Sequence, residues 1–136
     1  MNWVLLASGV LYVVGCCLPA LEFRDGKNVP DIMFGLRALA VGWSGLFAGV
    51  MAWYANPIWL FGVIAMAFRR PFPAVLAGVA AIAIALLTYS AVGRELPGDE
   101  GNVTKTTIVS VLPGFYFWLG SLVLLPLAAV FHRFAR

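Results

Sequence analysis

The sequence predicts an all-α membrane protein, a four-helix transmembrane bundle with a small extracytoplasmic β-structure contributed by its two outer loops. Two observations carry this fold class. First, 62% of the 136 residues are hydrophobic and 11% are charged, whereas soluble domains average roughly half and roughly a quarter. Second, stretches 1–21, 38–68, 71–93 and 106–131 contain no charged residue. A helix needs about 20 apolar residues to cross a bilayer, so each stretch is long enough for one span.

The positions of the spans follow from one pair of charges. Arg69 and Arg70 are adjacent, and an arginine at mid-bilayer costs about 2.5–3.5 kcal/mol. The pair therefore closes one span, and Pro71 and Pro73 open the next. We expect residues 1–136 to form a single domain, with spans at about 2–19, 51–68, 73–92 and 111–131 and outer loops at 20–50 and 93–110.

The distribution of charge predicts the orientation. With four spans, Arg69, Arg70, Arg133 and Arg136 fall on one side with no acidic residue among them. All six acids fall on the other side. The positive-inside rule then places both termini in the cytoplasm and both long loops outside. We expect contact with membrane lipids and none with nucleic acid, because the net charge of +3 is accounted for by orientation and by attraction to anionic lipid.

The two outer loops contain signals for strands. Asp25-Gly26 lies between Phe23 and Val29, which favours a hairpin. Residues 103–111 are rich in β-branched side chains and favour an extended conformation. We therefore expect residues 20–24 or 27–30 to pair with part of 103–109. The glycine-rich segment 32–50 is expected to lie along the membrane surface or to dip into the bundle, with a bend before the second span.

Catalytic and metal sites are not expected. His132 is the only histidine and has no carboxylate or thiol within a helical turn, and Cys16 and Cys17 are adjacent near the end of the first span. The spans hold no histidine or carboxylate that could serve as a base for a serine nucleophile or carry a proton. We therefore predict a non-enzymatic protein without a cofactor.

One motif in the second span admits two interpretations. Trp53-Tyr54-Ala55-Asn56-Pro57 follows Gly42-Trp43 by ten residues. In the structural interpretation, Trp and Tyr mark the membrane interface, Pro57 frees a backbone carbonyl one turn back, and the Asn56 amide satisfies local backbone groups or bridges helices. In the functional interpretation, the same region binds a lipid through Trp43, Trp53, Tyr54, Asn56 and Pro57.

The outer loops also hold the candidate residues for binding a partner. These loops are rich in acidic residues interspersed with arginines, which suits a protein interface, although loop charges are also common wherever a loop is solvated. The candidates are Glu22, Arg24, Asp25, Lys27, Asp31, Arg94, Glu95, Asp99 and Glu100.

Over most of its length the chain resembles a widespread group of small four-span bacterial inner-membrane proteins. The matching motifs are Leu18-Pro19-Ala20, Gly42-Trp43, Trp53-Tyr54-Ala55-Asn56-Pro57, Gly93-Arg94-Glu95-Leu96-Pro97 and Gly114-Phe115-Tyr116-Phe117-Trp118. Within that group it is similar to immunity proteins that protect bacteriocin producers from colicin M-like toxins, which cleave lipid II in the periplasm. This resemblance implies an outward surface that binds either the protein toxin or lipid II.

Two other functions stay open. One is a lipid-binding or small transport subunit, in which the 32–50 segment, Trp53 and Asn56 enclose a hydrophobic molecule. The other is an accessory subunit of a membrane complex. For the latter, the small-residue run at 77–85 would give close helix contact, unless those residues pack the protein's own core.

Overall fold

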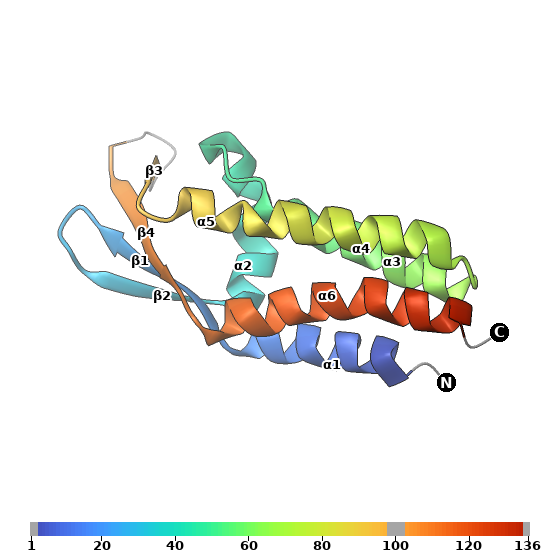
Figure 1. The fold of residues 1–136 in the computed structure, drawn as a ribbon. Coiled ribbons are helices and arrows are strands. Elements are labelled where there is room, and N and C mark those ends of the chain that lie inside the picture. Colours follow the sequence, from blue (N-terminus) through green and yellow to red (C-terminus); the bar gives the residue numbers. More distant parts are fainter. Residues whose placement is uncertain (1–2, 98–102, 135–136) are drawn as a thin grey trace.

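The computed structural model describes residues 3–97 and 103–134 and shows elongated helices with a β-sheet at one end (Figure 1). The start of α1 and the end of α6 both lie at the end of the molecule away from the sheet. In chain order the elements are α1 (Trp3–Cys17), β1 (Pro19–Asp25), β2 (Pro30–Phe34), α2 (Gly35–Val41), the 3-10 helices η1 (Gly42–Ala48) and η2 (Ala52–Tyr54), α3 (Ala55–Ala67), α4 (Pro71–Leu86), α5 (Thr88–Ala91), β3 (Glu95–Pro97), β4 (Lys105–Val111) and α6 (Pro113–Phe134).

The sheet joins the two segments that were expected to pair. Its four strands are antiparallel in the order β2-β1-β4-β3. Phe23 pairs with Ile108 and Arg24 with Thr107, which confirms the prediction that residues 20–24 pair with part of 103–109. The Asp25-Gly26 turn connects β1 to β2, with Asn28 in a left-handed conformation at φ 64°.

The prediction of four spans is wrong. Within residues 3–97 and 103–134, two helices are long and apolar enough to cross a membrane: Pro71–Ala91, with 21 residues, and Pro113–His132, with 20. Helix α1 has 15 residues and the apolar helix Ala52–Ala67 is likewise shorter than a span. At 1.5 Å per residue, α1 covers about 22 Å, whereas the hydrocarbon core is about 30 Å thick.

The expected spans at 2–19 and 51–68 are shortened for different reasons. Helix α1 ends at Cys17 because the chain becomes strand β1 at Pro19. The uncharged stretch 38–68 is divided among α2, η1, η2 and α3, with Gly49 in a left-handed conformation at φ 72°. The bend expected before the second span is therefore present. In both segments the absence of charged residues correctly indicated an apolar stretch, but it did not show that the stretch forms one continuous helix.

Glycines allow the helices to pack closely against one another. A Cβ atom on Gly15 of α1 would lie 2.8 Å from the Trp118 backbone nitrogen of α6, and one on Gly78 of α4 would lie 2.5 Å from Cδ of Pro126. Both glycines are buried. Other buried members of the small-residue run are Ala77, Ala81 and Ala85. Thus much of this run packs the protein's own core.

Candidate functional site

A cavity of about 410 Å³ lies where the helices meet the inner face of the sheet. Its walls come from α1, the sheet, α2, η1, η2, the first residues of α3 and α5, and the sheet-proximal end of α6. Most of the lining is apolar, as in ligand sites that enclose a hydrophobic molecule. Representative lining residues are Leu21, Met33, Leu39, Trp53, Ile108 and Phe115.

The Asn56 side chain is the polar centre of one cavity wall. Its Oδ1 atom accepts hydrogen bonds from the Tyr12 hydroxyl at 2.8 Å and from Nε1 of Trp118 at 2.9 Å. Its Nδ2 atom donates to the backbone oxygen of Trp53 at 2.8 Å. That carbonyl lies four residues before Pro57, which cannot donate to it. Asn56 therefore both satisfies a local backbone group and bridges helices, as the structural interpretation of the motif predicted.

A second polar chain lies deeper among the same helices. The buried Ser8 hydroxyl donates to the backbone oxygen of Ser121 at 2.7 Å and accepts from Nε1 of Trp59 at 3.2 Å. The Trp59 ring stacks on Tyr12, with ring centroids 4.2 Å apart. Together with the Asn56 contacts, this chain fixes α1 against α3 and α6 on one side of the cavity.

Two of the five residues that the sequence indicated as candidates for a lipid site line the cavity. Trp53 and Asn56 line it, and Nε1 of Trp53 donates to the backbone oxygen of Leu39 at 2.8 Å. Trp43 is 53% exposed on η1; like Tyr54 and Pro57, it is not a lining residue. Sequence reasoning missed Tyr12 and Trp118. Each is an aromatic residue with a polar atom within an apolar stretch of sequence. That both side chains contact Asn56 depends on the tertiary arrangement, which no local pattern shows.

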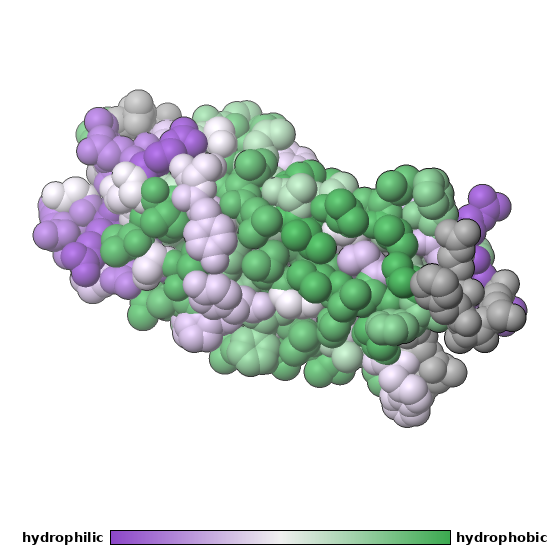
Figure 2. Space-filling model, in the orientation of Figure 1, coloured by the Kyte–Doolittle hydropathy of each residue, from purple (hydrophilic) through white to green (hydrophobic). Residues whose placement is uncertain are grey.

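The charged partner-binding candidates gather at the sheet end of the molecule. Figure 2 shows hydrophilic residues over this end and hydrophobic residues over the helices. Glu22, Arg24 and Asp25 lie on β1, and Asp31 on β2. Lys27 is in the turn between these strands, Arg94 precedes β3, and Glu95 begins it. Asp99 and Glu100 lie outside the described residues.

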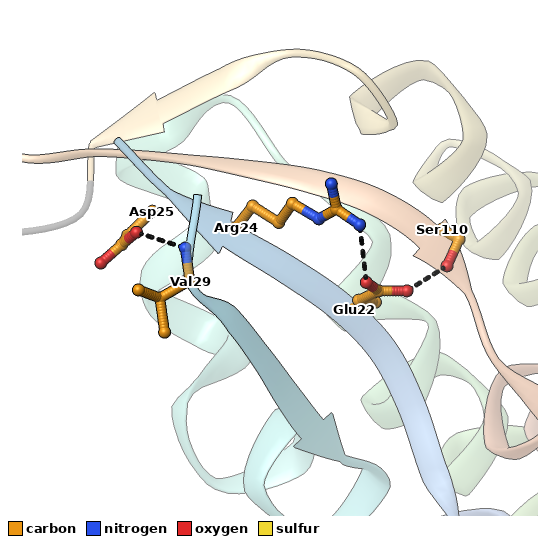
Figure 3. A network of polar contacts seen from close by, with 5 residues as sticks. All are labelled: Glu22, Arg24, Asp25, Val29 and Ser110. Atoms are coloured by element: carbon orange, nitrogen blue, oxygen red, sulfur yellow. Dashed lines mark hydrogen bonds and ion pairs between the residues drawn. The ribbon is translucent and has the colours of Figure 1, made fainter. Parts of the chain in front are cut away.

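Several of these charges are engaged within the protein. On β1, Glu22 accepts a hydrogen bond from the Ser110 hydroxyl at 3.2 Å and pairs with Arg24 at 3.6 Å (Figure 3). Asp25 Oδ1 accepts from the backbone nitrogens of Lys27 and Val29, each at 3.0 Å. The Asp25 carboxylate therefore stabilises the turn.

Two exposed ion pairs lie at other edges of the sheet region. Arg37 donates to Asp31 at 3.2 Å and Lys105 to Glu95 at 2.8 Å. The hydrogen bond and the charge of Lys105 hold the pKa of Glu95 below its usual value, and Glu95 raises the pKa of Lys105. Such pairs contribute little stability in water.

The two faces of the sheet are chemically different. Leu21, Phe23 and Met33 line the cavity. Because side chains alternate along a strand, Glu22, Arg24 and Ile32 point from the opposite, outer face. Ile32 is 50% exposed. The sheet thus separates a mostly apolar, partly open cavity from an outer face that combines charge with exposed apolar surface.

Among the side chains of the described residues, no group of three His, Cys, Asp or Glu residues comes together to hold a metal ion. Comparison with known proteins found no matching family model, no similar curated protein and no similar solved structure.

Proposed function

We propose that this membrane protein binds an amphiphile, a lipid with an apolar chain, in the cavity between the helices and the sheet. The observation that supports this function is the partly open cavity of about 410 Å³ with its mostly apolar walls. Polar groups at the edge of the site, including the Arg37 and Asp31 pair, suit the ligand's headgroup. An apolar chain inside the cavity releases water from apolar surface, which favours binding.

The proposal includes an orientation. Arg69 and Arg70 connect α3 to α4 at the end of the molecule opposite the sheet (Figure 1). Arg133 and Arg136 follow the second candidate span, Pro113–His132. The positive-inside rule therefore favours a cytoplasmic position for this end and an extracytoplasmic position for the sheet and cavity. The lipid would then come from the outer leaflet of a bacterial inner membrane.

Filling the cavity tests amphiphile binding. Ala38 lines the cavity from α2, whereas Ala40 on the same helix is exposed and does not line it. We expect Ala38→Phe to reduce binding of phosphatidylglycerol and phosphatidylethanolamine at least about tenfold, which corresponds to about 1.4 kcal/mol. Ala40→Phe serves as the matched control and should bind both lipids like the wild type.

The measurement is native mass spectrometry of the detergent-purified protein titrated with each phospholipid. Thermal unfolding of both variants shows whether the fold is retained. If folded Ala38→Phe and Ala40→Phe bind equally well, or if the wild type retains neither lipid, the cavity is not the proposed phospholipid site.

A second candidate function uses the outer face of the sheet. This face combines the Glu22 and Arg24 pair with the exposed apolar side chains of Ile32 and Phe34. Charge gives specificity at protein interfaces, and buried apolar surface gives affinity. These features support the immunity function implied by the resemblance, in which the protein binds a periplasmically acting colicin M-like toxin.

Reversing one charge on the outer face tests this second function. Cells that express the wild-type chain should survive a colicin M-type toxin, and Arg24→Glu should lower survival at least tenfold, because a like charge replaces the partner of Glu22 and of any acidic group on the toxin. Colony counts after toxin exposure give the result, with the amount of each variant in the membrane fraction as the control. Equal survival with Arg24→Glu, or no protection by the wild type, would argue against the immunity function.

A further inference from the structure

The segment from Gly35 to Tyr54, which contains α2, η1 and η2 and is called the cap segment here, has an exposed apolar surface. Phe47 is 82% exposed and Leu36 64%. Other exposed large apolar side chains of this segment are Val41, Trp43, Leu46 and Met51. Exposed apolar patches of this kind commonly mark contact with a membrane or a partner.

The cap segment has a defined structure. Gly49 closes η1, with its backbone nitrogen donating to Leu46 at 3.0 Å, and the Val50 nitrogen donates to Gly45 at 2.8 Å. A Cβ atom on Gly42 would lie 2.6 Å from the ring of Trp53, so the two parts of the segment are in close contact. Internal pairing of these backbone groups is what a segment needs in order to lie against lipid.

The position of the cap segment relates it to the candidate spans. Ala48 and Val50 pack against the buried cluster of Ala91, Leu96 and Ile108. Ala91 is the last residue of the apolar helix Pro71–Ala91, and Leu96 lies in strand β3. The cap segment is therefore at the level where a candidate span ends and the polar sheet begins (Figure 1).

The charges of this region fit the surface of a bilayer. Arg37 is the only charged residue between positions 32 and 68, and its side chain is 57% exposed. Nη2 of Arg94 lies 3.7 Å from the position that a Cβ atom of Gly49 would occupy. Arg37 is paired with Asp31 of β2, but the cap segment itself contains no acidic residue, and basic side chains beside an apolar surface are attracted to anionic lipid. A Trp such as Trp43 is also typical of the membrane interface.

We propose that the cap segment is seated in the interfacial layer of the bilayer that Pro71–Ala91 and Pro113–His132 cross, with Trp43 and Phe47 directed into lipid. The exposed apolar side chains of the cap segment thus contact the lipid bilayer itself. This inference depends on the two candidate spans and not on the ligand proposed for the cavity. Cap residues such as Ala38, Leu39 and Gly45 also line the cavity, so a cavity wall would lie beside the lipid headgroups.

Spin-label depth measurements test this placement. A nitroxide is attached at Phe47→Cys in a Cys16→Ser/Cys17→Ser background, and the protein is reconstituted into vesicles of phosphatidylethanolamine and phosphatidylglycerol. Accessibility to oxygen and to a water-soluble nickel chelate is then compared with two reference labels. Leu76→Cys, at an exposed position in Pro71–Ala91, reports the hydrocarbon core, and Lys27→Cys, in the β1–β2 turn, reports water.

We expect the oxygen-to-nickel accessibility ratio at Phe47 to lie above that at Lys27 and below that at Leu76, and Trp43→Cys to give the same order. A ratio equal to that at Lys27 would place the cap segment in water and overturn the proposal. Low accessibility to both reagents would also overturn the proposal, because it would show that protein, in this purified system a second copy of the chain, covers the surface. Binding of phospholipid in the cavity is measured separately and can succeed or fail independently of this result.

Discussion

Replacing Gly15 with leucine should destabilise the protein by roughly 3 kcal/mol, the upper end of the range for overpacked sites. Even a Cβ atom at this position would lie 2.8 Å from the Trp118 nitrogen and 3.1 Å from the Gly114 oxygen. Both are backbone atoms of α6, so a rotamer change cannot relieve the clash. Because α1 packs mainly against α6, the two helices must separate.

Gly9 on the same helix provides the matched control. A Cβ atom there would meet nothing within 4 Å, so Gly9→Leu should leave stability unchanged or raise it by up to about 1 kcal/mol through helix propensity. The measurement is unfolding in mixed micelles, followed by tryptophan fluorescence. Equal losses for Gly15→Leu and Gly9→Leu would show that the close approach of α1 to α6 does not determine stability.

Replacing Asn56 with leucine should cost about 1–3 kcal/mol of unfolding free energy, because polar groups inside the protein lose their partners. The Tyr12 hydroxyl and the Trp118 ring nitrogen would lose their common acceptor, and the Trp53 carbonyl would lose a donor. Leucine is close to asparagine in size, so the loss reports hydrogen bonding more than packing. The same micelle unfolding assay measures it.

A double-mutant cycle separates these bonds from general damage. Tyr12→Phe removes one donor to Asn56, so it should cost less in the Asn56→Leu background than in the wild type. Identical costs in both backgrounds would mean that Tyr12 and Asn56 do not interact energetically.

The sequence predicted the sheet because local chemistry determines it. Asp25-Gly26 forms the turn, and its carboxylate accepts two backbone hydrogen bonds there. The β-branched run became strand β4. The double role of Asn56 was also predictable, since an amide beside Pro57 lies near a carbonyl that lacks its usual donor.

The number of spans and the cavity could not be predicted in the same way. A stretch without charge is apolar, but its glycines decide whether it stays helical, as Gly49 does at φ 72°. The cavity joins Tyr12, Leu39, Ile108 and Trp118, which come from four separate elements. No local pattern shows that these residues will meet. Tertiary packing therefore determines the cavity, whereas turns in the backbone determine the number of spans.

The pairing of β1 with β4 has a consequence for biosynthesis. Ile108 follows its partner Phe23 by 85 residues, which takes roughly 4–17 s at a synthesis rate of roughly 5–20 residues per second. During that interval the β1–β2 hairpin is on its own, and an isolated hairpin is only marginally stable. Helix α1 likewise cannot pack against α6, its main packing partner, until α6 has been synthesised. The beginning of the chain thus reaches its final structure only after the end has been made, and a nascent chain truncated before residue 105 should be a ready substrate for membrane proteases.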